Sequence, residues 1–290
     1  TKGEYDVIDL KHINAKEGYV YYLASPDNAT QKYLYKTKLN GKGKNELQSP
    51  ERLKGSHDYS FSSNGTYAAH TFSNHFTPYS KEFIRVSNHK ALTEEESILK
   101  NINELEEKPT TEFFTITTAD NVEMDGWIVK PTNFDPTKKY PVVFYVYTEP
   151  AGTTVTDTYN IGRNGLYAGD MTEDGYIYIS IDNRGTPAPK GREWRKSIYR
   201  KIGVLNINDQ AMAAKEILKW DFVDADRVAV WGWSGGGSAT LNLMFRYPEI
   251  YKTGISVAAV ANQLTYDNIY QERYMGLPQE NMEDFIEGSP

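Results

Sequence analysis

The feature that most constrains this 290-residue sequence is a glycine-rich turn around Ser234, set between an apolar strand and an apolar helix. Residues 227–231 predict a buried strand, residues 238–247 predict a helix, and Gly-Trp-Ser-Gly-Gly-Gly lies between them. Gly-x-Ser-x-Gly in this context predicts a very sharp turn that exposes the serine hydroxyl, and small neighbours allow the chain to bend so tightly. The context favours a nucleophilic Ser234 over a glycine-rich turn without chemistry. The glycine and lysine pattern of a phosphate-binding loop does not fit.

A serine nucleophile also needs an oxyanion donor, a general base and an orienting acid. The helix that follows Ser234 offers free N–H groups and a positive dipole, which makes the N–H of Gly235 the predicted oxyanion donor. The acid and the histidine follow the serine in this kind of fold. All five histidines precede Ser234, at positions 12, 57, 70, 75 and 89, and no carboxylate after Ser234 suits the acid. We therefore expect a piece of a longer protein, cut before the acid and the histidine and inactive by itself.

The rest of the chain changes its pattern twice. Residues 1 to about 90 show short alternating strands with Asn-Gly turns, which predicts an all-β region of sheets or propeller blades. Residues 91–107 are charged with helical spacing, which predicts a junction helix, although a solvated surface helix would have the same pattern. After residue 110, strands alternate with a helix, which predicts an α/β layer fold with a mostly parallel sheet. The predicted elements there are strands at 112–118, 122–129, 142–146, 176–181 and 227–231, and a helix at 206–220.

Composition excludes several classes of function. The net charge of -7 argues against a nucleic-acid partner, which would require a basic face. With no cysteine, the chain has no disulfide, no thiol catalysis and no cysteine-ligated metal. The sequence contains no run of about 18 apolar residues, so no membrane span is predicted. Neither a metal nor an organic cofactor is implied.

Several motifs together resemble one family. They are Lys139-Tyr140-Pro141, Val146-Tyr147, Asp182-Asn183-Arg184-Gly185, Gly232-Trp233-Ser234 and the long stretch from Tyr266-Asp267 to Gly276-Leu277-Pro278. Over almost its whole length the chain resembles the C-terminal part of the prolyl oligopeptidase superfamily, in the dipeptidyl peptidase IV branch. The resemblance implies that residues 1–92 are the closing blades of a β-propeller domain and that residues 93–109 are a linker helix. Residues 110–290 would be an α/β-hydrolase catalytic domain that is incomplete at its end.

The resemblance also assigns roles at the site. It implies that Ser234 is the nucleophile and that the Tyr147 hydroxyl holds the oxyanion together with a backbone N–H. Tyr266 and Tyr270 would wall the small pocket for proline at the penultimate position, with Val260 as its apolar residue. Two residues depart from the family pattern: Gly235 stands where an aromatic residue is usual, and Gln263 stands where tryptophan is common. We expect one wall of the proline pocket to be missing or open, which leaves room for alanine or for longer substrates.

The function that follows is a serine exopeptidase that releases N-terminal dipeptides, with proline or alanine at the penultimate position, through an acyl-enzyme on Ser234. An acyl-aminoacyl peptidase, an oligopeptidase or an esterase of the same fold is the alternative, and a non-catalytic interaction module is the second. The residues that bind the free amino group would lie upstream of this chain. The resemblance also implies a peptide substrate, a possible homodimer of the full-length protein, and a periplasmic or secreted location.

Overall fold

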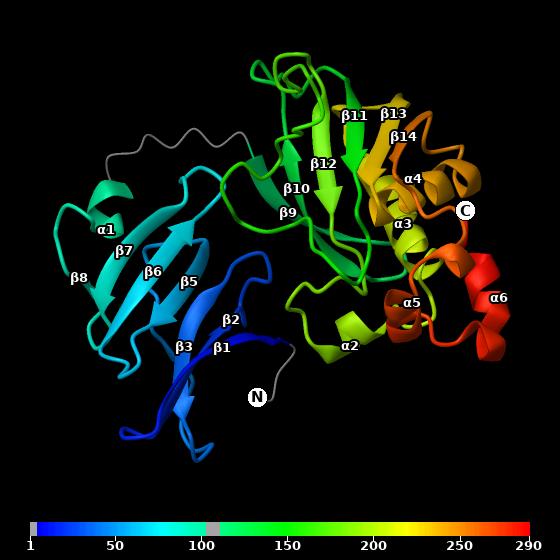
Figure 1. The fold of residues 1–290 in the computed structure, drawn as a ribbon. Helices are drawn as coiled ribbons and strands as arrows, with labels where there is room; N and C mark the ends of the chain where they lie inside the picture. The colour runs from blue at the N-terminus through cyan, green and yellow to red at the C-terminus, as the bar shows by residue number, and fades with distance from the viewer. Residues whose placement is uncertain (1–4, 103–110) are drawn as a thin grey trace. The chain divides into compact units, whose positions relative to one another are not determined.

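The computed structural model describes residues 5–102 and 111–290, and the chain folds into two compact units (Figure 1). The first unit comprises the described residues up to 102, together with Thr156–Ile161 and Pro189–Arg192. The second comprises residues 111–155, Gly162–Ala188 and Glu193–Pro290. The domain limits predicted at residues 92 and 109 stay predictions, since residues 103–110 lie outside the described ranges.

The first unit consists of two four-stranded antiparallel sheets, drawn blue to cyan in Figure 1. One sheet contains, in spatial order, β1 (Val7–Asn14), β2 (Tyr19–Ala24), β3 (Tyr33–Lys38) and β4 (Glu46–Leu47). The other contains, in spatial order, β5 (Ser56–Phe61), β6 (Tyr67–Ser73), β7 (Ser80–Arg85) and β8 (Lys90–Ala91). Each strand pairs with the next one along the chain, which is the meander of a propeller blade.

The turns and the core of this unit follow from the sequence pattern. Gly41 and Gly65 have φ angles of 71° and 70°, so each takes the left-handed conformation that glycine adopts at little cost. The Gly65 N–H donates to the Ser62 carbonyl oxygen at 2.9 Å and closes the turn between β5 and β6. A shared apolar cluster is built from buried residues of five strands: Tyr21, Leu23, Leu34, Tyr59, Ala68 and Ile84.

The helix predicted over residues 91–107 is mostly absent from the described part of that range. Residue 91 ends strand β8, and the helix α1 covers only Ile98–Asn101. Its one buried residue, Ile98, packs with Leu53 and Phe72 of the first unit. The prediction for residues 103–107 lies outside the described residues. Three of the charged residues in this range, Glu94, Glu95 and Glu96, lie instead in a turn before α1, where they face solvent.

The second unit is built on one mixed six-stranded sheet. Its strands are β9 (Thr111–Thr117), β10 (Glu123–Val129), β11 (Tyr140–Tyr145), β12 (Ile177–Ile181), β13 (Val223–Trp233) and β14 (Thr253–Val257). Their spatial order is β14-β13-β11-β12-β10-β9. The four strands β12, β11, β13 and β14 are parallel, and β9 and β10 form the antiparallel pair that the sequence predicted.

Helices connect these strands. They are α2 (Arg192–Lys196), α3 (Leu205–Ile217), α4 (Gly235–Arg246), the 3-10 helix η2 (Gln263–Thr265), α5 (Asn268–Tyr274) and α6 (Pro278–Gly288). The helix predicted at 206–220 is α3, which ends three residues early. The helix predicted from residue 238 is α4, which begins at Gly235, directly after the serine. The connection from β13 through α4 to its parallel neighbour β14 is a βαβ unit.

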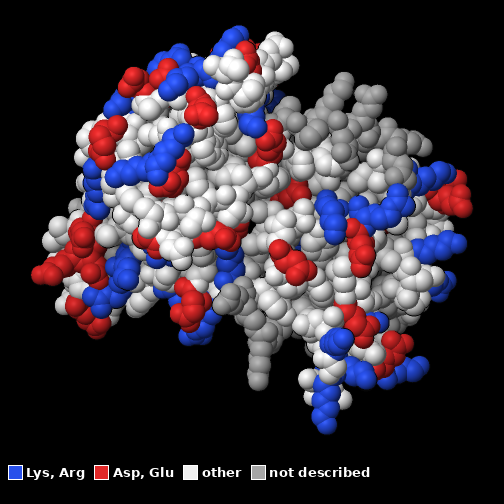
Figure 2. All heavy atoms as spheres, turned by 180° about the vertical axis from the view of Figure 1, so that it is seen from behind, with Lys and Arg blue, Asp and Glu red and all other residues white. Residues whose placement is uncertain are grey.

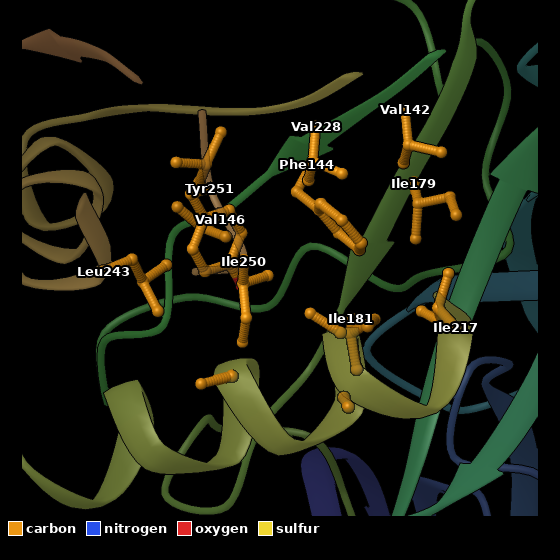
Figure 3. Packing of buried hydrophobic residues seen from close by; sticks show 14 of the residues in the cluster. Val142, Phe144, Val146, Ile179, Ile181, Ile217, Val228, Leu243, Ile250 and Tyr251 are labelled. Atoms are coloured by element: carbon orange, nitrogen blue, oxygen red, sulfur yellow. The ribbon is translucent and has the colours of Figure 1, made fainter. Parts of the chain in front are cut away.

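The core of the second unit lies between the sheet and α3, as Figure 3 shows. Val142 and Phe144 on β11 and Ile179 on β12 project from the sheet toward the helix that carries Ile217. Three buried alanines of α3 (Ala211, Ala213 and Ala214) have side chains small enough for the helix to approach the sheet closely. This core fixes the ends of β11 and β13, from which the candidate site is built.

The surface matches the composition. On the face shown in Figure 2, acidic and basic side chains of the described residues are interspersed, and none of the blue areas forms a continuous basic face. Within residues 5–102 and 111–290, each helix is too short or too polar to cross a bilayer.

Candidate active site

Ser234 lies at the turn between β13 and α4 with a strained backbone. Its φ and ψ angles are 56° and -118°, a conformation that a residue with a side chain rarely adopts. The Ser234 N–H donates to the carbonyl oxygen of Val257, the last residue of β14, at 2.9 Å. Its carbonyl oxygen accepts from the Ser238 N–H at 3.0 Å. The strand before Ser234 and the helix after it are both fixed by packing, and together they hold the turn that the sequence predicted.

The glycines around Ser234 are required by close backbone contacts. A Cβ on Gly236 would overlap the carbonyl oxygen of Val146, which follows β11. A Cβ on Gly237 would lie 2.5 Å from the Val257 carbonyl oxygen, and one on Gly232 would meet the backbone of Gly236 at the same distance. The turn is therefore wedged between the ends of its two parallel neighbours, β11 and β14, and only glycine fits at these three positions.

Two hydrogen-bond donors are available beside Ser234. Gly235 is the first residue of α4, so its N–H has no acceptor within the helix and lies at the positive end of the helix dipole. Tyr147 follows β11 and lines the same pocket as Ser234 and Gly235. Burial, and after it the nearby Glu149, raises the pKa of the Tyr147 phenol, which therefore keeps its proton at neutral pH and can donate.

The segment that carries Tyr147 is fixed by two asparagines from elsewhere in the second unit. Thr148 has a positive φ of 69°, and its hydroxyl accepts from the Nδ2 of Asn206 on α3 at 2.8 Å. The Thr148 carbonyl oxygen accepts from the Nδ2 of Asn183 at 3.1 Å. All three residues are buried. The turn is thus preorganised by α3 and by the loop after β12, and sequence reasoning gave no role to either asparagine at this turn.

The Asp182-Asn183-Arg184-Gly185 motif forms this loop after β12, and its side chains hold the loop in place. The buried Asp182 carboxylate accepts from the backbone N–H groups of Thr154 and Val155 at 2.9 and 3.2 Å, and burial raises its pKa to about 6. Arg184 pairs with the carboxylate of Asp209 on α3 through Nε at 3.0 Å and Nη2 at 2.6 Å. The motif therefore ties the loop after β12 to α3 and to the segment after Tyr147, and positions the site without lining its pocket.

The structure places all six residues that the sequence assigned to the site around one small pocket in the second unit. Its complete lining is Tyr147, Glu149, Ser234, Gly235, Val260, Gln263, Tyr266 and Tyr270. The pocket encloses about 300 Å³ of empty space, open solvent included. The catalytic and binding roles of the six residues remain predictions. Glu149 had no role in the sequence analysis, and Gln263 had entered it only as a departure from the family pattern.

The two tyrosines are held by the start of α5. Asp267 caps this helix, and its carboxylate accepts from the Tyr270 N–H at 2.9 Å. The rings of Tyr266 and Tyr270 pack edge to face, with centroids 5.3 Å apart. Val260 is fixed from the other side, because its N–H donates to the Ser238 hydroxyl of α4 at 2.9 Å.

The expectation of a missing wall at Gly235 is wrong, because Glu149 occupies that space. A Cβ placed on Gly235 would lie 2.7 Å from Cδ and 2.8 Å from Oε1 of Glu149. The Glu149 side chain therefore packs directly against the backbone that carries the nucleophile, and the residue is only 6% exposed. This contact was not predicted, because Glu149 and Gly235 are 86 residues apart in the sequence and no spacing rule relates them.

Gln263, the second departure from the family pattern, is paired within the second unit. The residue is buried, and its Oε1 accepts from the Nε2 of Gln271 on α5 at 2.7 Å. Its backbone N–H donates to the Ser289 hydroxyl after α6 at 2.9 Å. A polar pair therefore stands where the family pattern has a large apolar ring, and the wall on this side is closed by an amide.

A buried polar cluster in the first unit brings His70, Glu82 and His89 within reach of a single ion, with ligand atoms within 4.8 Å of one another. Both ring nitrogens of His70 already have partners, His57 Nδ1 at 2.8 Å and Glu82 Oε1 at 2.7 Å. His57 Nε2 donates to the Leu53 carbonyl oxygen, so His57 Nδ1 accepts and His70 Nε2 donates. An ion bound by His70 would have to displace one of these hydrogen bonds, whereas the buried Nδ1 of His89 has no hydrogen-bond partner among the described residues.

Comparison with known proteins finds a match for each of the two units. The sequence profile described as "Prolyl oligopeptidase family" matches residues 168–290, and that of the "Dipeptidyl peptidase IV (DPP IV) N-terminal region" matches residues 1–79. The chain is 32% identical over 290 residues to "Probable dipeptidyl-aminopeptidase B" of Neurospora crassa, covering 98% of this chain and 31% of that protein. The protein of the same description from Coccidioides posadasii is 33% identical over 292 residues, with the same coverage.

A solved structure agrees with these matches. The crystal structure of Porphyromonas gingivalis dipeptidyl peptidase 4 superposes with a TM-score of 0.85 at 33% identity, covering all of this chain and 40% of that one. The fold is thus the last blades of a β-propeller followed by an α/β-hydrolase domain, as the sequence predicted. The chain belongs to the prolyl oligopeptidase family of serine peptidases, in the dipeptidyl peptidase IV branch. It spans about a third of the length of the curated relatives it matches.

Proposed function

We propose that this chain supplies the nucleophile, the oxyanion donors and the penultimate-residue pocket of a serine peptidase that removes dipeptides from free N-termini. The observation that carries the proposal is the pocket itself. Ser234, with its strained backbone, shares it with Tyr147, Tyr266 and Tyr270, from three separate segments of the chain. The relatives named above are described as dipeptidyl-aminopeptidases, which supports the same chemistry.

In the proposed reaction the Ser234 hydroxyl attacks the scissile carbonyl after the second residue of the peptide. The carbonyl oxygen becomes an oxyanion that accepts hydrogen bonds from the Gly235 N–H and the Tyr147 hydroxyl. The amine of the remaining peptide leaves, an acyl-enzyme ester stays on Ser234, and water then hydrolyses it. The general base and its acid come from outside residues 1–290 in this proposal, because no histidine follows Ser234 in the sequence.

The pocket supports a small penultimate residue, of the size of proline or alanine. Two tyrosine rings and Val260 offer apolar contacts, and the room between them is narrow. The periplasmic or secreted location belongs to this proposal by family resemblance, and so does homodimer formation by the full-length protein.

The test uses the full-length gene product that carries this chain. We expect rapid cleavage of Gly-Pro p-nitroanilide with a free amino group, and little cleavage of its N-acetylated form. Ser234→Ala should reduce kcat by about 10⁴-fold or more, while the exposed-serine control Ser63→Ala should leave it unchanged. Equal cleavage of the acetylated substrate would instead favour an acyl-aminoacyl peptidase or an oligopeptidase. Turnover that survives Ser234→Ala would refute the mechanism.

A further inference from the structure

The strand register of the β5–β8 sheet brings a histidine and a glutamate together. His70 on β6 is paired with Glu82 on β7, so their side chains lie next to each other on one face of the sheet. His89, in the turn between β7 and β8, completes a group whose three ligand atoms lie within 4.8 Å of one another. His70 is fully buried and Glu82 is 3% exposed. The three residues have no zinc-type spacing in the sequence, so only the folded sheet shows the group.

The hydrogen bonds of His70 leave one of its ring nitrogens ready for a metal ion. The other ring nitrogen, Nε2, donates to His57, as the Leu53 carbonyl requires. A single proton therefore lies between His70 Nδ1 and Glu82 Oε1, which are 2.7 Å apart. Burial lowers the pKa of His70 to about 3 and raises that of Glu82, so the imidazole is neutral and its Nδ1 presents a lone pair. A metal ion can take the place of this proton.

His89 supplies an independent observation. Its Nδ1 is buried and has no hydrogen-bond partner within the described part of the chain, which is rare for a buried polar atom. The atom is already closed off from solvent, so its missing partner has to be small. Its Nε2 lies 2.8 Å from the Tyr59 hydroxyl, and with this nitrogen protonated Nδ1 presents a lone pair. His89 as a whole is only half-buried, so opening of the surface turn gives an ion access.

Each of the three side chains is also held by a hydrogen bond on the side away from the group. His70 donates to His57, and the His89 ring is paired with Tyr59. The Oε2 atom of Glu82 accepts at 3.1 Å from the first backbone N–H of α1. Metal-binding histidines and carboxylates in proteins are oriented by partners of this kind, which fix the ring tautomer and the direction of the lone pair.

We propose that His70, Glu82 and His89 bind a Zn²⁺ ion that ties β6, β7 and the turn after β7 together. Two imidazole nitrogens and one carboxylate oxygen are a zinc donor set, and a water molecule completes the tetrahedron. Ca²⁺ and Mg²⁺ suit the group poorly, because they prefer six or more oxygen ligands. The site lies entirely within the first unit and does not depend on the function proposed for the second.

The geometry requires a small adjustment on binding. Two ligands of a tetrahedral zinc ion lie about 3.3 Å apart, given bond lengths of about 2.0–2.1 Å. The contact between His70 Nδ1 and Glu82 Oε1, now 2.7 Å, must therefore open by about 0.6 Å. Rotation of the Glu82 carboxyl group about its last side-chain bond allows this, because that torsion has a broad range.

The first experiment measures Zn²⁺ binding by titration calorimetry to the full-length gene product after treatment with a chelator. His89→Gly removes a ligand and suits the turn, because the φ angle of His89 is 51°. Glu82→Gln keeps the shape of the side chain and removes its charge. We expect each variant to weaken this site more than about 100-fold, since even an outer partner of a ligand contributes about 10- to 100-fold. The matched control His12→Ala, a histidine of the same unit outside the group, should bind as the wild type does.

The second experiment measures hydrogen exchange of the β6 and β7 amides that exchange through unfolding of the sheet. At a free Zn²⁺ concentration of about 100 times the dissociation constant, their protection should rise about 100-fold in the wild type and in His12→Ala. It should not change in His89→Gly, and Ca²⁺ at the same concentration should have no effect in any of the proteins. The protection of His89→Gly without metal shows whether that variant is folded.

Three results would overturn the inference. Folded wild-type protein that binds no Zn²⁺ would remove the site. Zn²⁺ affinity that stays the same in His89→Gly or in Glu82→Gln would place the ion on other residues. Equal protection by Ca²⁺ would show that the group does not act as a zinc donor set.

Discussion

The packing of Glu149 against Gly235 predicts that these two positions are energetically coupled. The change is Gly235→Ala, made in the wild-type background and in Glu149→Ala. In the wild type the new Cβ lies 2.7 Å from Cδ and 2.8 Å from Oε1 of Glu149, against the 3.4–4.0 Å of ordinary contact. Overpacking of this size costs about 1–3 kcal/mol of unfolding free energy.

The sign should reverse when the glutamate is removed. Gly235 is the first residue of α4 and its φ angle is not positive, so its backbone conformation is one that alanine can adopt. Without Glu149 the substitution should stabilise the second unit by about 0.5–1 kcal/mol, the usual gain of alanine over glycine in a helix. The coupling energy of the cycle is then about 1.5–4 kcal/mol.

Urea unfolding followed by tryptophan fluorescence measures this cycle. All five tryptophans (positions 127, 194, 220, 231 and 233) belong to the second unit, so the signal reports that unit alone. Gly165→Ala is the matched control, because no atom lies within 4 Å of the place that its new Cβ would take, and it should change little in either background. Gly236→Ala should destabilise the second unit equally in both backgrounds, because its new Cβ would overlap the Val146 carbonyl oxygen. Equal effects of Gly235→Ala in the two backgrounds would refute the contact.

Two further predictions concern pH. The raised pKa of Glu149 means that the folded state holds a proton that the unfolded state has released above pH 4.5, so stability falls as pH rises from 4.5 toward 8. The gain in unfolding free energy from Glu149→Gln should therefore be about 3 kcal/mol larger at pH 7 than at pH 4.5. Urea unfolding curves that give the same gain at both pH values would contradict this. In the first unit, burial lowers the pKa of His57 well below its usual range and that of His70 to about 3, so both stay neutral when folded. The unfolded chain binds these protons below pH 6.5, so the stability of the first unit should fall as the pH is lowered. Hydrogen-exchange protection of the β5 and β6 amides, corrected for intrinsic exchange, should therefore fall by about 1.4 kcal/mol per pH unit for each histidine, and the raised pKa of Glu82 should oppose part of this fall. Constant protection from pH 7 to pH 5 would contradict the prediction.

The sequence by itself determined the elements and the position of the nucleophile. The apolar runs and the glycines around Ser234 are local signals, because a buried parallel strand needs apolar side chains on both faces and a sharp turn needs residues without Cβ. The strands at 142–146, 176–181 and 227–231 were each found within a few residues. The helix predicted at 91–107 failed in the described residues because charge and helical spacing also occur in solvated turns.

Tertiary structure alone decided what fills the pocket and what holds it. The glycine at position 235 suggested an empty wall, but Glu149 reaches that space from a loop after a neighbouring strand. Asn183 and Asn206 likewise act across the fold on the backbone of Thr148. Such contacts join residues dozens of positions apart, and their geometry depends on strand order and on helix packing. Local sequence patterns carry no record of either, so the chemistry of the pocket could be found only once the chain was folded.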